Sequence, residues 1–180
     1  MNASHLRHTA IVSAITVTTM MTLTSCATKK TSYDFISLAH AAITLEMDIE
    51  EKDNHKLYIE AAEWIGTPYR AGGDTKKGTD CSGMVCSIYK KVFGKKLQRN
   101  SDDQRTKNCN KVSKSKLKEG DLVFFHTGKS KRTATHVGIY LKQDKFIHAS
   151  NLQGVCVSSL TEPYWEKVWL QAGRVKGVKN

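Results

Sequence analysis

The sequence predicts an α+β protein whose helices come first and whose sheet is antiparallel. Apolar residues recur at helical spacing as far as Phe93, and from Asp121 onward they fall into short runs typical of strands. A parallel sheet would instead require helices and strands to alternate along the chain. The order of the elements therefore favours helices packed on a small antiparallel sheet.

Three stretches have the apolar spacing of helices, namely residues 33–49, 54–65 and 81–93. Asp53 or Asn54 is suited to cap the second helix, because a side-chain oxygen at that position accepts a hydrogen bond from free backbone N–H groups. Gly66 and Gly94 follow the second and third helices, where a glycine commonly ends a helix. The polar residues 100–116 show no clear period and are expected to be irregular.

Four stretches are expected to be strands: Asp121–Phe125, His136–Leu141, Lys145–Ser150 and Val155–Leu160. Only three residues separate the middle two, so these two strands should form a hairpin. If Leu141 pairs with Lys145, His148 lies opposite Gly138 and diagonal to His136, with both histidines on one face. A slip of one residue would put the histidines on opposite faces. The hairpin register therefore decides whether the two imidazoles meet.

The N-terminus has the features of an export signal. A short basic start precedes an uncharged, threonine-rich stretch at residues 9–24. A membrane-spanning helix needs about 20 apolar residues, so a transmembrane anchor is the weaker alternative. The stretch ends in Leu23-Thr24-Ser25-Cys26, which resembles the lipobox at which bacterial lipoproteins are cleaved and acylated. Residues 1–25 are therefore expected to be a signal peptide and Cys26 the lipidated residue.

Cleavage before Cys26 would leave a chain long enough for one domain. We expect residues 26–55 to hold the lipidated cysteine, a tether and an N-terminal helix, and residues 56–180 to form the main domain. Only one Arg precedes Cys26, so the remaining chain keeps 27 Lys and Arg against 17 Asp and Glu, a formal charge of +10. An exported protein rarely meets nucleic acid, so an anionic cell wall or an acidic membrane surface is the expected partner.

Four cysteines follow Cys26, and they have unlike settings. Cys86 lies in a predicted helix and Cys156 in a predicted strand, so both are expected to be buried small apolar residues. A disulfide that uses Cys109 is left open. The absence of a CxxC motif or a regular spacing argues against a disulfide framework.

Cys81 stands at the start of a predicted helix, with two histidines downstream on the predicted hairpin. The helix N-terminus favours negative charge and so favours a thiolate. A thiolate beside an imidazole that a third polar group orients is the arrangement used by cysteine hydrolases. Taken singly, Cys81, His136 and His148 are each more often structural, and only their convergence predicts nucleophilic catalysis. A zinc site is the weaker alternative, because no closely spaced pair of ligands is present.

Other polar and aromatic residues are weaker candidates. Tyr69 lies in the glycine-rich loop before the cysteine, where its phenol would be able to donate a hydrogen bond to an oxyanion or to substrate. His126 is expected to be a surface residue. Trp64, Trp165 and Trp169 are expected to pack in the interior, with a sugar-binding surface as the alternative.

Six blocks, in the same order, resemble the NlpC-type cysteine peptidases of bacterial cell walls. They cover residues 68–73, 78–83, 97–101, 120–125, 136–140 and 146–150, within a resemblance that extends over about residues 56–180. The segments 162–165 and 172–175 are also similar to the single-domain murein endopeptidase lipoproteins of the Spr type. The chain departs from the family at Gln98, where proline is usual, and at Ala71, where an aromatic residue is frequent. The first change is expected to loosen a loop and the second to reshape a subsite.

The resemblance implies a papain-like cysteine peptidase fold, with the nucleophile helix packed on the sheet. It implies that Cys81 is the nucleophile, that His136 is the general base and that His148 is the residue that orients the base. Tyr69, Asp80 and Ser82 would flank the site, with Tyr69 and the Cys81 backbone amide donating to the oxyanion.

The activity that the resemblance implies is hydrolysis of an amide bond in peptidoglycan stem peptides or their cross-links. No metal or organic cofactor and no nucleic acid partner is expected, and the protein would be a lipid-anchored monomer of the cell envelope that faces the wall. Similarity to the Spr type favours the cross-link over the γ-D-glutamyl–diamino acid bond within a stem. Two alternatives are left open: a non-catalytic wall-binding module, and an acyltransferase or thioesterase on the same scaffold.

Overall fold

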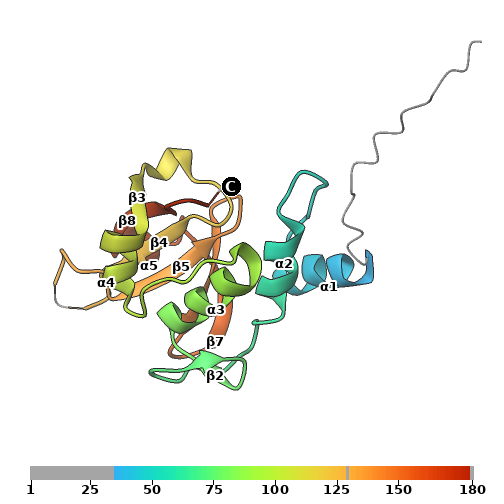
Figure 1. The fold of residues 1–180 in the computed structure, drawn as a ribbon, viewed down its shortest axis with the longest axis horizontal. Helices are drawn as coiled ribbons and strands as arrows, with labels where there is room; N and C mark the ends of the chain where they lie inside the picture. Colours follow the sequence, from blue (N-terminus) through green and yellow to red (C-terminus); the bar gives the residue numbers. More distant parts are fainter. Residues whose placement is uncertain (1–34, 129, 179–180) are drawn as a thin grey trace, which may run out of the picture. The chain divides into compact units, whose positions relative to one another are not determined.

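A computed structural model describes residues 35–128 and 130–178 (Figure 1). The expected signal peptide and Cys26 lie outside the described residues. The helical elements are α1 (Phe35–Leu45), α2 (His55–Ala62), α3 (Cys81–Phe93), α4 (Ser101–Asp103), the π-helical turn η1 (Gln104–Asn108), the 3₁₀ turn η2 (Lys114–Lys116) and α5 (Pro163–Lys167). The strands are β1 (Asp74–Thr75), β2 (Gly78–Thr79), β3 (Cys109–Val112), β4 (Leu122–Phe125), β5 (His136–Tyr140), β6 (Lys145–Ser150), β7 (Gly154–Ser159) and β8 (Trp169–Val175). The predicted α+β class is confirmed.

The main sheet has the strand order β3-β8-β4-β5-β6-β7, and every neighbouring pair is antiparallel. Strands β4 to β7 are the four predicted strands, with ends shifted by at most one residue. The prediction missed β3 and β8. Strand β3 is short and lies at an edge, with Cys109 its only buried residue, and β8 pairs with β4 across an irregularity at Phe124 and Phe125. Neither strand therefore shows the regular alternation of apolar and polar residues from which strands are predicted.

The helix ends are set by a capping side chain and by residues that adopt a positive φ. Asn54 caps α2, because its side chain accepts a hydrogen bond from the Leu57 N–H at 3.1 Å. Helix α3 has the predicted bounds and ends at Gly94, whose φ of +63° is readily reached by glycine. Helix α1 is shorter than predicted and stops at Leu45, because the next residue, Glu46, turns to a φ of +50°. No helix in the described residues is long and apolar enough to cross a bilayer.

Helix α3 packs on the part of the sheet formed by β5 and β6, as predicted for the helix that begins at Cys81 (Figure 1). Its inward face joins the larger apolar cluster, which includes Met84, Val85, Ile88, Tyr89, Leu122, Phe124, Val137, Ile139, Ile147 and Ala149. The opposite face of the sheet is covered by a smaller cluster of Val123, Phe125, Phe146, Leu160, Trp165 and Ala172. Successive residues of β4 enter different clusters because side chains alternate along a strand.

The β5–β6 hairpin has the predicted register. Ile139 pairs with Ile147 and Tyr140 with Phe146, and the Leu141 N–H donates to the Lys145 carbonyl at 2.9 Å. The loop closes through Gln143 and Asp144, whose φ angles are +52° and +60°. This register leads to Gly138 facing His148, and a Cβ added at Gly138 would lie 3.3 Å from the His148 Cβ. The two histidines therefore share one face of the sheet.

Candidate active site

Cys81 is the first residue of α3 and is almost fully buried. The Asp80 carboxylate caps this helix by accepting a hydrogen bond from the Gly83 N–H at 2.8 Å. It also accepts from the Gly72 N–H at 2.8 Å, which ties the preceding loop to the helix start. Asp80 therefore fixes the backbone that presents the Cys81 thiol.

Tyr69 lies on a loop that hydrogen bonds hold against two strands. The Thr79 N–H donates to Pro68 O at 3.1 Å, and the Arg70 N–H donates to Thr79 O at 2.8 Å. The Val155 N–H of β7 also donates to Thr67 O at 2.8 Å. Because these bonds fix the backbone on both sides, the phenol of Tyr69 is held at the edge of the cleft that contains Cys81, where 40 % of the residue is exposed.

The two histidines contact each other directly. Nε2 of His136 lies 3.1 Å from Nδ1 of His148, and the rings meet edge to face with centroids 5.1 Å apart. On the other side of its ring, Nε2 of His148 lies 3.1 Å from Ser158 Oγ and 3.5 Å from Cys156 Sγ. Cys156 was expected to be a buried apolar residue, and the structure instead shows it half-buried and in contact with His148.

Trp165 encloses the histidine pair. Its ring stacks on His136 with centroids 5.5 Å apart and meets His148 edge to face at 4.8 Å. Phe125 and Phe146 pack against the same histidines from the sheet. Trp165 is thus part of the interior, as predicted, but it also forms a wall of the site, a role that the sequence pattern did not indicate.

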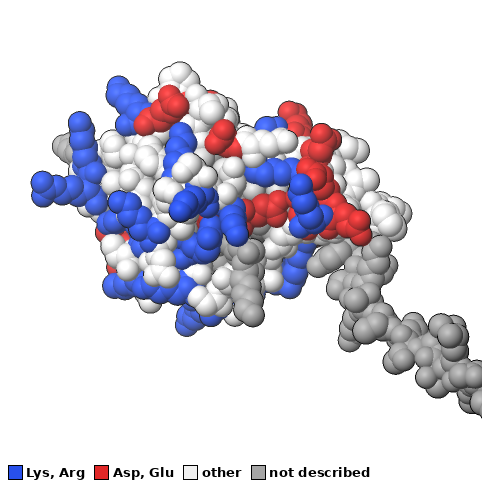
Figure 2. All heavy atoms as spheres, turned by 90° about the horizontal axis from the view of Figure 1, so that it is seen from above, with Lys and Arg blue, Asp and Glu red and all other residues white. Residues whose placement is uncertain are grey.

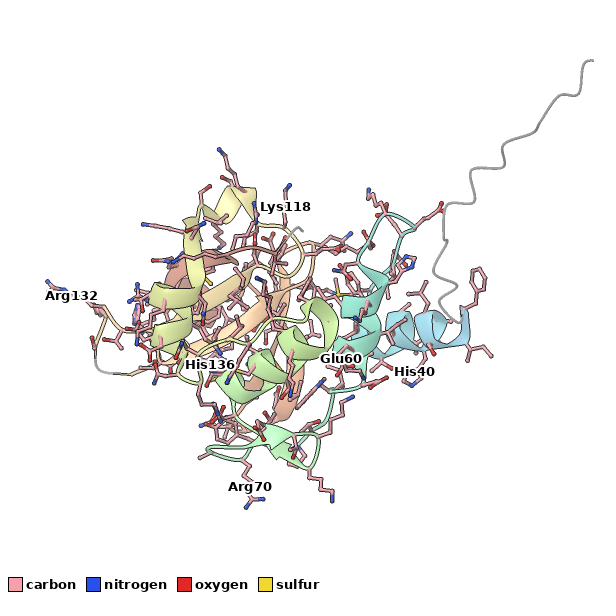
Figure 3. The ribbon with its side chains drawn as sticks, in the orientation of Figure 1. His40, Glu60, Arg70, Lys118, Arg132 and His136 are labelled. Atoms are coloured by element: carbon pink, nitrogen blue, oxygen red, sulfur yellow. The ribbon has the colours of Figure 1, made fainter. Side chains whose placement is uncertain are left out.

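One cleft brings these residues together. It has a volume of about 550 Å³ and is lined by Tyr69, Cys81, Thr127, Thr135, His136, His148, Ala149, Ser150, Asn151, Leu152, Tyr164 and Trp165. Figure 3 shows His136 next to α3, while Arg70 and Arg132 point away from the body of the protein. Asp80 and Ser82 do not line the cleft and lie instead at the start of α3.

Arg99 links the residues that flank Cys81, and sequence reasoning gave it no role. Its guanidinium donates to both Asp80 carboxylate oxygens at 2.6 and 2.8 Å and to Ser82 Oγ at 2.8 Å. It also donates to the Gly73 carbonyl at 3.0 Å. The only sequence feature that pointed to a role for Arg99 was its position in a block that resembles the family. Its distance along the chain from Cys81 does not indicate a contact.

The Cys81 side chain was expected to be a thiolate, and the structure instead favours a neutral thiol. Burial raises the pKa of the Cys81 thiol above its ordinary value, and the backbone N–H groups of Val137 and Ser82 counteract this only in part. Burial lowers the pKa of His136 to about 4. Burial, with a smaller contribution from His136, lowers the pKa of His148 to about 3. A neutral thiol beside two neutral imidazoles is therefore the resting state near pH 7.

The remaining candidates lie outside the cleft. His126 is half-buried. Trp64 is buried, and its indole N–H donates to the buried Glu60 carboxylate at 2.8 Å, which also pairs with Lys91 of α3 (Figure 3).

The described cysteines, Cys81, Cys86, Cys109 and Cys156, are all free thiols. Within residues 35–128 and 130–178, no cluster of three or more His, Cys, Asp or Glu side chains is arranged to hold a metal ion.

The two departures from the family pattern have different settings. The Gln98 N–H donates to Asn108 Oδ1 at 2.7 Å, a bond that a proline at this position would be unable to make. Gln98 therefore adds an anchor to a loop that it was expected to loosen. Ala71 is exposed and does not line the cleft.

A thiol at a helix N-terminus and an imidazole pair on an antiparallel sheet, all lining one cleft, define the papain-like class of cysteine hydrolases. Comparison with known proteins identifies the family within this class. The model of the NlpC/P60 family matches residues 66–174, which is more than half of the chain. The protein belongs to the NlpC/P60 family, and the resemblance seen in the sequence is confirmed.

Several relatives support this assignment. The chain is 46% identical over 113 residues to the probable endopeptidase NlpC homolog of Haemophilus influenzae, covering 63% of this chain and 58% of the relative. It is 46% identical over 114 residues to the murein DD-endopeptidase MepS/murein LD-carboxypeptidase of Escherichia coli K12, with the same two coverages. A solved NLP/P60 family structure from Staphylococcus aureus, described as similar to lipoprotein, has a TM-score of 0.62 at 32% identity and covers 74% of this chain and 44% of that one. The chain thus spans less than two thirds of the length of these relatives.

Proposed function

We propose that the protein is a cell-wall endopeptidase that hydrolyses amide bonds of peptidoglycan stem peptides or their cross-links. Cys81 is the nucleophile, His136 the general base and His148 the residue that orients the base. The observation that carries the proposal is the opening of all three side chains into one cleft. The names of the two relatives at 46% identity, an endopeptidase and a murein endopeptidase, support the substrate class.

The proposed reaction begins with a neutral thiol and a neutral imidazole. Since His136 Nε2 is engaged with His148, Nδ1 of His136 is the nitrogen that takes the Cys81 proton while sulfur attacks the carbonyl carbon. The Tyr69 hydroxyl and the Cys81 backbone N–H donate to the oxyanion. His136 then protonates the leaving amine, and a thioester remains on Cys81. A water that gives its proton to His136 then attacks the thioester carbonyl carbon. The carbon–sulfur bond breaks, His136 returns the proton to the sulfur, and the carboxylic acid product and the Cys81 thiol are released.

We propose the peptide cross-link as the preferred bond. The relative from Escherichia coli is named a DD-endopeptidase, and the Spr-type resemblance of the sequence favours the same bond. Cleavage within a stem, at the γ-D-glutamyl–diamino acid bond, is the alternative. The two differ in products, because cross-link cleavage converts dimeric muropeptides to intact monomers and the alternative shortens the stems.

The proposed location is the cell envelope, with the enzyme tethered to a membrane and facing the wall. In this proposal residues 1–25 are removed, Cys26 carries lipid within a tether region of residues 26–55, and residues 56–180 act as a monomeric peptidase domain. The surface charge suits an anionic wall: Lys and Arg are spread over most of the face in Figure 2, and Asp and Glu gather toward one end.

Digestion of purified murein by the full-length protein, followed by mass analysis of the muropeptides, tests the function. Cys81→Ala should abolish product release, whereas Cys86→Ala, which changes a half-buried cysteine on the same helix, should leave it intact. Full activity of Cys81→Ala would exclude the thiol mechanism. An added amine or alcohol that is recovered on the stem peptide would indicate an acyltransferase, and murein binding without any product would indicate a non-catalytic module.

A further inference from the structure

His148 has both ring nitrogens engaged. Nδ1 faces His136 Nε2 at 3.1 Å, and Nε2 faces Ser158 Oγ at 3.1 Å. Ser158 lies on β7, two residues beyond Cys156, which is the register partner of His148. The histidine is almost fully buried, which limits competition from solvent for its ring nitrogens.

The proton positions along this chain of contacts depend on one another. A neutral imidazole carries one N–H, so one of its nitrogens donates and the other accepts. If His136 Nδ1 is to receive the thiol proton, Nε2 of His136 must carry hydrogen and donate to His148 Nδ1. His148 must then carry its own hydrogen on Nε2, and that N–H needs an acceptor.

Two atoms compete for this Nε2–H. Ser158 Oγ is the nearer at 3.1 Å and is a good acceptor, whereas Cys156 Sγ is at 3.5 Å and is a weak one. If Nε2 instead accepted a proton from either group, His148 would carry hydrogen on Nδ1 and donate to His136. His136 would then hold hydrogen on Nδ1, the nitrogen that must be free. The tautomer of His148 thus determines whether His136 is a base toward Cys81.

We propose that Ser158 is a positioning residue that fixes His148 in the Nε2–H tautomer by accepting this hydrogen bond. The consequence for catalysis rests on the proposed roles of Cys81, His136 and His148, but the tautomer itself does not. Ser158 acts through His148 and does not line the substrate cleft.

Nitrogen NMR of the full-length protein labelled at histidine tests the tautomer directly at pH 7. Correlations from the ring carbons distinguish an imidazole protonated at Nε2 from one protonated at Nδ1, and loss of signals in His148→Asn assigns them. We expect His148 to be the Nε2–H tautomer in the unmodified protein and a mixture in Ser158→Ala. Nδ1–H in the unmodified protein would overturn the proposal whether or not the variant folds, and so would an unchanged tautomer in Ser158→Ala.

Kinetics with soluble dimeric muropeptides test the consequence. We expect Ser158→Ala to lower kcat about tenfold with KM unchanged, since one net hydrogen bond to the base relay is lost, and Ser158→Thr to restore most of the rate. The matched control is Ser159→Ala, the next residue on β7, whose hydroxyl contacts Thr161 at 2.8 Å instead of His148. Cys156→Ala should also keep the rate. A full rate in Ser158→Ala, or an equal loss in Cys156→Ala, contradicts the assignment of Ser158.

The two proposals fail in different ways. If His148 shows the expected tautomer but Cys81→Ala still cleaves murein, the thiol mechanism is wrong and the positioning role of Ser158 stands. If Cys81→Ala is inactive and His148 shows the Nδ1–H tautomer, the enzyme assignment stands and Ser158 has no positioning role.

Discussion

The imidazole Nε2 of His136 lies 3.1 Å from Nδ1 of His148, across a hairpin whose register brings both rings to one face of the sheet. Neither ring carries a charge near pH 7, because burial lowers both pKa values well below the ordinary value for histidine. In the proposed mechanism the pair is a neutral relay, and its proton affinity sets how activity responds to acid.

The first prediction concerns the acid limit of activity. In the proposed mechanism only neutral His136 accepts the Cys81 proton, and burial lowers the pKa of His136 to about 4. We expect kcat/KM to stay near its maximum down to about pH 5 and to fall by half near pH 4. Release of muropeptides from pH 3.5 to 8, with samples returned to pH 7 to exclude denaturation, measures this. An acid limb near pH 6.5 would show that His136 titrates as an exposed histidine does.

The second prediction concerns stability. His136 and His148 have lower pKa values folded, about 4 and about 3, than in an unfolded chain, near about 6.5. The unfolded state therefore binds more protons as pH falls below about 6.5, and the free energy of unfolding must decrease from there toward pH 4. Urea unfolding at about pH 7 and pH 5 tests this, because carboxylates protonate mostly below that interval. His148→Asn should make the decrease smaller, and an equal decrease in both proteins would contradict the assignment.

The third prediction separates two arginine–carboxylate pairs. Arg99 holds Asp80 and Ser82 beside Cys81, with 45% of its side chain exposed. Lysine is unable to reproduce the forked contacts of Arg99, so Arg99→Lys should displace the helix start and lower kcat/KM about tenfold. The loss of stability should be small, because an exposed ion pair such as Arg99–Asp80 contributes about 1 kcal/mol or less.

Arg174 is the matched control for Arg99. It makes the same two-point contact with Asp121, at 2.8 and 2.7 Å, but that carboxylate is fully buried and away from the cleft. Arg174→Lys should therefore cost about 2 kcal/mol of stability, since it weakens a buried pair, and should leave kcat/KM unchanged. Thermal unfolding and initial rates of both variants give the comparison. Equal effects on activity would indicate that Arg99 contributes only to general stability.

Much of the site was predictable from local sequence rules. The register of the β5–β6 hairpin followed from the length of its loop and from the alternation of side chains along each strand. This register brought His136 and His148 together as expected. The bounds of α3 followed from apolar spacing and from Gly94. These features are local, so a short stretch of sequence determines them.

What escaped prediction depends on contacts between distant segments. Arg99 reaches Asp80 across nineteen positions, and no periodicity signals such an ion pair. Trp165 is compatible with any core, and only the fold puts its ring against the two histidines. The thiol at Cys81 was expected to ionise on helix-dipole grounds, but burial outweighs that effect and raises its pKa. Tertiary environment, which the sequence does not display locally, decided each of these cases.

The last prediction concerns Gly138, which faces His148 across the hairpin. A Cβ at this position would lie 2.6 Å from the Phe146 ring and 2.8 Å from the Ile147 carbonyl oxygen, and the backbone atom has little freedom to move away. Gly138→Ala must therefore separate the strands or shift β6, at a cost of about 2 kcal/mol for overpacking. Any shift of β6 carries His148 away from His136.

Gly94→Ala is the control for Gly138→Ala, because its added Cβ meets no atom within 4 Å and its only penalty is the positive φ of +63°, about 1 kcal/mol. We expect both variants to lose stability in urea, but only Gly138→Ala to lose activity, by more than tenfold, at temperatures where both are fully folded. A Gly138→Ala protein that keeps the full rate would show that the base tolerates displacement of its partner, and the 3.1 Å contact between the imidazoles would then be packing rather than part of the reaction.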